Sequence, residues 1–169
     1  MDIRTEKPED LTAVREVNMM AFGRANEANL VDRLRGIRST FSFVAVQSDR
    51  IVGQVFFSPV TLVEKCSREL SILGLGPVAV LPKYQRQGIG TLLIQHGLKE
   101  CVRSGFHAVF VLGNPNFYSR FGFIPASRKN LRCEYDVPDE AFMVLELESG
   151  ALDNCSSTVK YRSEFSICD

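Results

Sequence analysis

Apolar side chains recur at helical spacing in three stretches of the chain, over residues 8–23, 26–36 and 89–104. The first stretch opens with Pro8 and two acidic residues, which suit the first turn of a helix, and it stops at Gly23. The pattern therefore predicts three amphipathic helices. In the third, one face of the helix carries Ile89, Leu92, Leu93, His96, Gly97 and Cys101.

Runs of β-branched and aromatic residues predict the strands of a sheet. A polar turn joins the runs at 41–46 and 51–57 into an antiparallel hairpin, and the run at 69–81 continues the meander. The helix at 89–104 then connects 69–81 to a run of buried type at 107–112, which predicts a right-handed crossover and a parallel pair. The sequence thus favours an α+β fold with a mixed sheet. Shorter runs predict further strands at 2–6, 60–63, 123–125, 141–147 and 158–161.

The second half of the chain is less regular. Residues 116–121 predict a short aromatic helix, and Gly122 permits a sharp exit from it. Residues 126–139 are mostly polar and predict no clear element. Because no repeat, low-complexity tract or linker interrupts the chain, we expect one domain over 1–169, with its last residues, 149–169, forming a polar tail.

Composition and charge are those of an ordinary globular protein, with a formal net charge of zero. The chain lacks the basic excess of nucleic-acid binders, so we expect no nucleic-acid partner. Its five cysteines are odd in number and widely spaced, without a CxxC pair: Cys66, Cys101, Cys133, Cys155 and Cys168. This spacing favours reduced thiols over a disulfide framework or a zinc site. With two distant histidines as well, we expect no metal.

The N-terminal residues 1–7 lack the apolar core of a signal peptide. No run approaches the roughly 18 apolar residues that span a bilayer. We therefore expect a cytoplasmic protein with no membrane partner.

One stretch, residues 75–94, combines a β-branched strand, a turn at Pro82, two closely spaced glycines and the start of an amphipathic helix. The first-turn N–H groups of a helix have no partner within the helix, and the helix dipole adds partial positive charge there. Gly88 and Gly90 let an anion approach the backbone without meeting a Cβ. The stretch predicts a site that holds a phosphate.

Three kinds of anion-binding loop have this outline. A mononucleotide P-loop requires a lysine after its last glycine, and none follows Gly88 or Gly90. A dinucleotide fingerprint requires a third glycine, where this chain has Leu93, and it does not follow an antiparallel meander. The pyrophosphate loop of acetyl-CoA-dependent acyltransferases reads Q/R-x-x-G-x-G/A, which Gln85, Gly88 and Gly90 match. The pattern favours this third loop.

Three motifs give the chain a resemblance to the GNAT superfamily of N-acetyltransferases, and within it to the YhbS-like group. The motifs are LGPVAV at 75–80, YQRQGIG at 84–90 and FYSRFGF at 117–123, with further likeness at 27–35, 142–147 and 159–161. The resemblance covers most of the chain. It implies the GNAT acyl-CoA N-acyltransferase fold, with α/β/α layers, an antiparallel meander, a βαβ crossover at the CoA site and flanking helices. The core of that fold would span about 1–148.

The resemblance also implies how acetyl-CoA would be bound as a cosubstrate. Backbone N–H groups of the loop would hold its pyrophosphate, and a strand would pair with the pantetheine amides as if the cofactor were an added strand. A backbone N–H of that strand would polarise the thioester carbonyl. The implied residues are Val78, Ala79 and Val80 in the strand, and Gln85, Arg86, Gln87, Gly88, Ile89, Gly90 and Thr91 in the loop.

Tyr118 is the one side chain to which the resemblance gives a catalytic role, as the acid that protonates the departing thiolate close to the CoA sulfur. A phenol, with a reference pKa of about 10, is a suitable acid for this step. Packing within a short aromatic helix explains the same tyrosine equally well. The resemblance places Asn114 near the pantetheine arm, and an N-cap before Pro115 explains it as well.

No residue is assigned as the general base, and the acids Glu27, Glu69 and Glu140 are interpreted as surface carboxylates. The resemblance implies transfer of an acetyl group to an amine of a small molecule or protein, by direct attack in a ternary complex. The alternative is a non-catalytic module that binds or senses acyl-CoA on the same fold. The sequence leaves open the acceptor, the acyl chain length and whether the protein is a monomer or a homodimer.

Overall fold

A computed structural model describes residues 1–168, and Asp169, in the expected tail, lies outside the described residues. Contacts divide the chain into two compact units. Unit 1 comprises Met1–Ser58, Gly76–Lys99 and the stretch that begins at Ser163. Unit 2 comprises Pro59–Leu75 and Glu100–Arg162. That these units form one domain stays a prediction.

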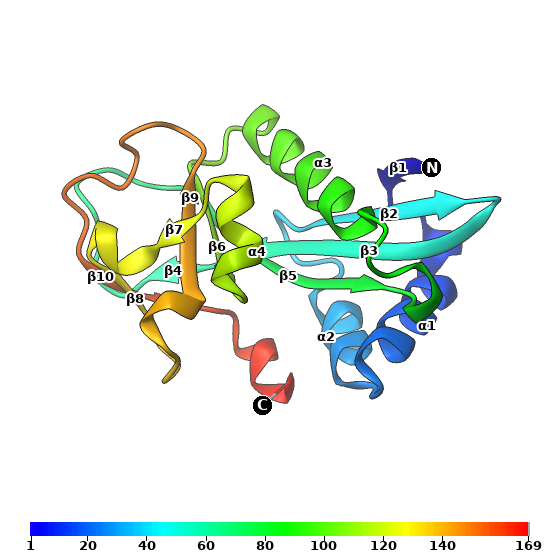
Figure 1. Cartoon of the computed structure of the whole chain (residues 1–169). Coiled ribbons are helices and arrows are strands. Elements are labelled where there is room, and N and C mark those ends of the chain that lie inside the picture. Colours follow the sequence, from blue (N-terminus) through cyan, green and yellow to red (C-terminus); the bar gives the residue numbers. More distant parts are fainter. Residues whose placement is uncertain (169) are drawn as a thin grey trace. The chain divides into compact units, whose positions relative to one another are not determined.

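Unit 1 carries the N-terminal strands and three helices. Its elements are β1 (Asp2–Thr5), a 3₁₀ turn (Pro8–Asp10), α1 (Leu11–Phe22), α2 (Asn26–Leu34), β2 (Phe41–Gln47), β3 (Arg50–Pro59), the second half of β5 (Ile72–Val80), a 3₁₀ turn (Pro82–Tyr84), most of α3 (Ile89–Arg103) and a last 3₁₀ helix (Ser163–Cys168). β2 pairs antiparallel with β1 and with β3. Figure 1 shows α1 and α2 on one face of these strands and α3 on the other. The predicted hairpin is confirmed.

Two neighbouring residues of β3 hold helices on opposite faces, because successive residues of a strand point to opposite sides. A Cβ on Gly53 would lie 3.0 Å from Leu93 Cδ1 and 3.2 Å from Ile89 Cγ2, so the glycine lets the first turns of α3 approach the strand closely. On the other face, the fully buried Asn18 of α1 donates a hydrogen bond to Gln54 Oε1 at 2.8 Å. Gly97 repeats the close approach further along α3, against the ring of Phe57.

Unit 2 contains the crossover strand and most of the irregular second half. Its elements are β4 (Thr61–Leu62), the first half of β5, the end of α3, β6 (Ala108–Leu112), α4 (Pro115–Tyr118), a 3₁₀ turn (Ser119–Phe121), β7 (Ile124–Pro125), a 3₁₀ turn (Ala126–Lys129), β8 (Leu131–Cys133), a 3₁₀ turn (Asp139–Ala141), β9 (Phe142–Glu146) and β10 (Ser157–Lys160). β6 pairs parallel with β5 and antiparallel with β9, which also pairs with β7. β4, β10 and β8 form a second, small sheet. The predicted parallel pair and the α+β class are confirmed.

The residues on the apolar face of α3 are not all buried. Leu92 is 44% exposed, whereas Leu93, Ile94 and Cys101 are fully buried. α3 packs closely on β3 at Gly53 and at Gly97, so the side of α3 that carries Leu93 faces the sheet. Successive residues of a helix are rotated by about 100°, so Leu92 points away from that side. Ile94 lies three residues before Gly97, on the same face.

The expectation that the cysteines are all reduced is wrong for two of them. Cys66 and Cys155 form a disulfide in unit 2, across a sequence separation of 89 residues. Spacing along the chain did not reveal this pair, because the fold brings the polar connection after β4 against the segment that precedes β10. Cys101 and Cys133 are free thiols, and burial raises the pKa of each, to about 12 for Cys101.

No helix within residues 1–168 is both long and apolar enough to cross a membrane. The expected cytoplasmic compartment stays a prediction.

Candidate active site

The loop between β5 and α3 is held by hydrogen bonds within unit 1. Leu81 N donates to Val52 O at 2.9 Å, which ties the end of β5 to β3. The chain then turns through Pro82–Tyr84, and the Gln85 side chain donates back to Val80 O at 2.9 Å. The loop is thus fixed at its strand end by the backbone and by one glutamine side chain.

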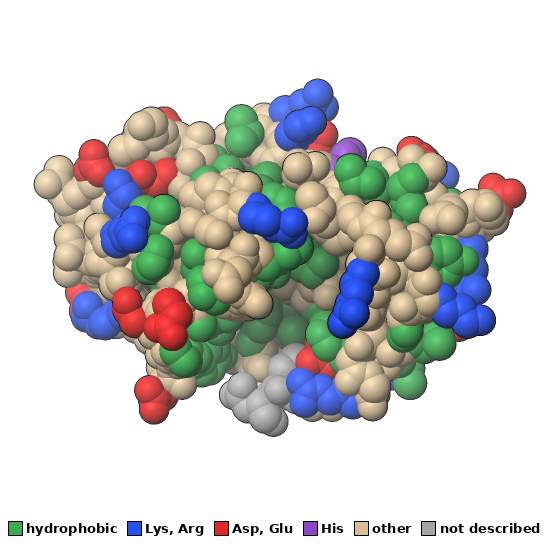
Figure 2. Space-filling view, viewed as in Figure 1, with side chains coloured by type: hydrophobic (Ala, Val, Ile, Leu, Met, Phe, Trp, Pro, Cys, Tyr) green, Lys and Arg blue, Asp and Glu red, His purple; other side chains and the backbone are tan. Residues whose placement is uncertain are grey.

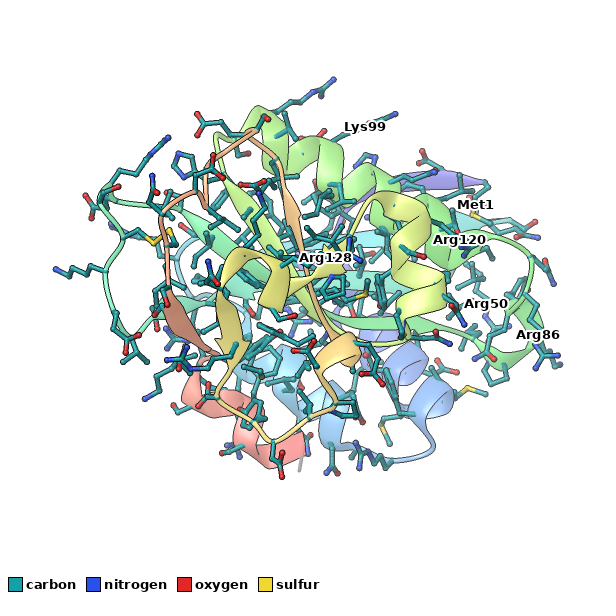
Figure 3. The ribbon with its side chains drawn as sticks, turned by 60° about the vertical axis from the view of Figure 1, so that its left-hand side comes forward. Met1, Arg50, Arg86, Lys99, Arg120 and Arg128 are labelled. Carbon is teal, nitrogen blue, oxygen red and sulfur yellow. A yellow bond between two sulfur atoms is a disulfide. The ribbon has the colours of Figure 1, made fainter. Side chains whose placement is uncertain are left out.

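The same loop adopts left-handed backbone conformations just before α3. Arg86 has φ of 62° and Gly88 has φ of 86°. The first turn of α3 closes with the bond from Leu92 N to Gly88 O at 3.1 Å. The N–H groups of residues 89–91 precede that bond and therefore have no acceptor within the helix. Figure 3 shows Arg86 on the outer side of this loop.

Gly90 leaves room that the surrounding protein does not use. A Cβ at this position would have Val78 Cγ1 as its nearest neighbour, at 4.0 Å, so packing alone does not require glycine here. Its φ also lies outside the left-handed range. An anion that approaches the first turn of α3 would account for the missing Cβ. The loop therefore fits a pyrophosphate group.

The pairing of β5 with β6 covers only part of β5. It runs from Ile72 opposite Ala108 to Leu75 opposite Val111. The three predicted strand residues, Val78, Ala79 and Val80, lie beyond the last of these pairs. Ala79 is buried and its two neighbours are half-buried.

The second predicted element, α4 and the turn after it, lies in unit 2. Asn114 caps α4, because its side-chain oxygen accepts a hydrogen bond from Asn116 N at 2.9 Å. The capping explanation is therefore confirmed, and a contact of Asn114 with a cofactor stays a prediction. Gly122, with φ of 97°, ends the following turn.

The half-buried ring of Tyr118 lies among aromatic side chains. It meets Phe117 edge-on at 5.0 Å and Phe123 edge-on at 5.7 Å between ring centroids. Arg120 covers the Phe117 ring at 4.6 Å. Burial raises the pKa of the Tyr118 phenol to about 12, so the hydroxyl stays protonated across the working pH range of enzymes.

The interpretation of the three acids as surface carboxylates is wrong for one of them. Glu27 is 7% exposed, and its carboxylate pairs with the Arg24 guanidinium, whereas Glu69 and Glu140 are exposed. The amphipathic pattern of this helix predicted that its charged side chains face solvent. Glu27 instead lies buried in the first turn of α2, where Arg24, just before the helix, donates a hydrogen bond to its carboxylate. No group of three or more potential metal ligands exists within residues 1–168.

The predicted residues fall into two sets. The strand and loop residues belong to unit 1, and Asn114 and Tyr118 belong to unit 2. The sequence did not single out Gly53 and Gly113. At each of them a side chain packs where a Cβ would lie, and only the folded structure shows that contact. On the face seen in Figure 2, the basic side chains of the described residues are interspersed with acids and form no continuous field.

Sequence comparison identifies relatives over nearly the whole chain. The family model described as the acetyltransferase (GNAT) domain matches residues 38–125. The N-acetyltransferase YhbS of Escherichia coli is 36% identical over 168 residues, covering 98% of both chains. The N-acetyltransferase YjhQ of Escherichia coli is 36% identical over 135 residues, covering 78% of this chain and 74% of YjhQ.

Two solved structures resemble the whole fold. Escherichia coli YhbS in complex with CoA superposes with a TM-score of 0.90 at 34% identity, covering 98% of this chain and 91% of that one. A GNAT acetyltransferase from Brucella melitensis in complex with acetyl-CoA gives a TM-score of 0.78 at 32% identity, covering 97% of each chain.

Proposed function

Since the chain belongs to the GNAT family of acetyltransferases, we propose that it binds acetyl-CoA and transfers the acetyl group to an amine. The observation that carries the proposal is the loop before α3, which combines unpaired first-turn N–H groups with open space at Gly90. Two solved relatives, at 34% and 32% identity, hold CoA and acetyl-CoA.

The pyrophosphate lies against the loop formed by residues 85–91. The N–H groups of residues 89–91 donate to its oxygens, and the Thr91 hydroxyl and the Arg86 charge add contacts. The loop's left-handed turn is already formed at Arg86 and Gly88, so binding requires little ordering of the backbone.

The pantetheine arm pairs with the backbone of residues 78–80. Support comes from the end of the β5–β6 ladder at Leu75 opposite Val111, since the strand continues beyond it. An N–H of this segment polarises the thioester carbonyl and stabilises the negative charge that forms on its oxygen. Asn114 caps α4, and a contact of its side chain with the cofactor is part of this proposal.

The amine nitrogen attacks the thioester carbonyl carbon directly, without an acyl-enzyme. The C–N bond forms, the C–S bond breaks, and the sulfur leaves with the electron pair. The amine loses one proton to solvent, the Tyr118 hydroxyl donates a hydrogen bond to the sulfur as negative charge develops on it, and solvent supplies the proton of the released CoA thiol. No side chain is assigned as the base.

The raised pKa of Tyr118 limits how it acts. A thiol has a reference pKa of about 8.5, well below the value of about 12 for this phenol. Full proton transfer to a finished thiolate is therefore uphill. The phenol is suited to donate a hydrogen bond while negative charge develops on the sulfur, and solvent completes the protonation.

The test is a calorimetric titration with acetyl-CoA, followed by a thiol-release assay against polyamines, amino acids, aminoglycosides and peptides. We expect binding, and turnover with at least one primary amine. Failure to bind acetyl-CoA would overturn the proposal. Binding without transfer to any of these amines would indicate instead a module that senses acyl-CoA. Sedimentation of the same samples distinguishes a monomer from a homodimer.

A further inference from the structure

Gly113 joins β6 to the cap of α4, and its missing side chain leaves the space that the Tyr118 ring occupies. A Cβ on Gly113 would lie 2.3 Å from Tyr118 Cε2, 2.9 Å from Cδ2 and 3.4 Å from Cζ. Side-chain carbons do not approach this closely, so the ring lies in direct contact with the backbone at this residue. The φ of Gly113 is outside the left-handed range, so conformation is not the reason for glycine here.

The position of Gly113 is itself fixed. Its N–H donates to Ala141 O at 2.9 Å, which holds the end of β6 to the residue that precedes β9. The ring is also confined by the edge-on contacts with Phe117 and Phe123. Backbone and aromatic neighbours together leave the Tyr118 ring little freedom to move.

From this geometry we infer that Gly113 is a positioning residue for the Tyr118 hydroxyl, an inference that rests on the proposed function. An alanine at 113 would displace the ring by about 1 Å, since ordinary contact begins near 3.4 Å. A misplacement of about 1 Å can cost a catalytic group up to about a hundredfold in rate. Gly113 touches neither acetyl-CoA nor the amine in this scheme and acts only through the tyrosine.

The test is a double-mutant cycle of wild type, Gly113→Ala, Tyr118→Phe and the double variant, assayed with the best amine from the acceptor panel. We expect Gly113→Ala to lower kcat by about 10–100-fold and to leave the KM for acetyl-CoA within about twofold, because residues 85–91 are untouched. In the Tyr118→Phe background, Gly113→Ala should cost nothing further, since the hydroxyl it positions is already absent.

Gly97→Ala is the matched control. Its Cβ would lie 2.3 Å and 2.6 Å from the ring carbons of Phe57, a collision of the same size that involves unit 1 and not Tyr118. This variant should lose stability to a similar degree and keep its kcat. A crystal structure of Gly113→Ala should show the displaced ring. Phe117→Leu, which removes the nearest aromatic neighbour of the ring, provides a second variant if Gly113→Ala does not fold, with the same expected cycle.

The outcomes separate the two claims. No acetyl transfer by the wild type would overturn the proposed function, and an unchanged kcat in Tyr118→Phe would remove only the tyrosine from it. An unchanged kcat in Gly113→Ala, or an equal fall with and without the Tyr118 hydroxyl, would overturn the inference alone. A raised KM for acetyl-CoA with unchanged kcat would also overturn it.

Discussion

The loop before α3 and the turn around Tyr118 represent two ways of building a site. In the loop the groups proposed to bind the ligand are backbone N–H donors. The absence of a side chain at Gly88 and Gly90 leaves the space in which they bind it. Around Tyr118 a single hydroxyl is the working group, and a shell of aromatic rings and one glycine hold it.

The difference teaches which changes each region tolerates. A site made of backbone survives most side-chain exchanges and fails when a Cβ enters its open space. A site made of one side chain fails when that side chain is changed or displaced. The loop should therefore control affinity for the cosubstrate, and Tyr118 should control turnover.

The largest expected effect is that of Tyr118→Phe. Removing the hydroxyl should lower kcat by about 10²–10³-fold, the range for losing one hydrogen-bond donor to developing negative charge, and leave the Kd of acetyl-CoA unchanged. Stopped assays with the best amine acceptor and calorimetry measure the two quantities. An equal loss of affinity would show that the tyrosine binds the cosubstrate, and the contrast between the two regions would fail.

The second largest effect is expected from reduction of the Cys66–Cys155 disulfide. A crosslink across 89 residues stabilises by about 2–4 kcal/mol, chiefly by restricting the unfolded chain. Dithiothreitol should lower the Tm by about 5–15 °C for a chain of this size. Affinity for acetyl-CoA should persist, since the loop of residues 85–91 lies in unit 1 and the disulfide in unit 2. The variant with Cys66→Ser and Cys155→Ala should show no response to the reductant. An equal response in that variant would mean that reduction acts elsewhere.

Gly90→Val tests whether the open space at the loop binds the cosubstrate. Its side chain would fill the open space before the first turn of α3, so the Kd of acetyl-CoA should rise by about 10–100-fold, or about 1.4–2.8 kcal/mol. Because the protein itself leaves this space free, the Tm should fall little. Leu92→Val, at an exposed position two residues on, is the control and should bind normally. Normal binding by Gly90→Val would remove this glycine from the site.

The smallest expected effect concerns pH. The raised pKa of Tyr118, about 12, keeps the donor form present at all pH values below it and removes that form only above it. The rate should therefore rise as the acceptor amine loses its proton and should show no fall near pH 10 due to this residue. A falling limb near pH 10 that disappears in Tyr118→Phe would contradict the effect of burial.

The sequence predicted the features that depend on local residue patterns and on residues close together in the chain. The crossover from β5 through α3 to β6, the cap at Asn114 and the exit at Gly122 all follow from periodicity and turn residues. Contacts between distant segments could not be predicted in this way. The disulfide joins two cysteines 89 residues apart, and no spacing along the chain encodes that pair. Glu27 pairs with Arg24 only three residues away, but its burial depends on what α2 packs against. The contact of the Tyr118 ring with Gly113 depends on how α4 turns back toward the end of β6.

The early end of the β5–β6 ladder has a consequence for the protein without its ligand. A strand that continues past the last pair of one ladder can present backbone amides to another extended chain, which is a route to self-association. On the proposed function, the pantetheine arm covers these amides, so the cosubstrate also protects the fold. Saturation at a hundred times the Kd adds about 2.7 kcal/mol to stability. The supply of CoA would then affect the stability of this protein as well as its rate.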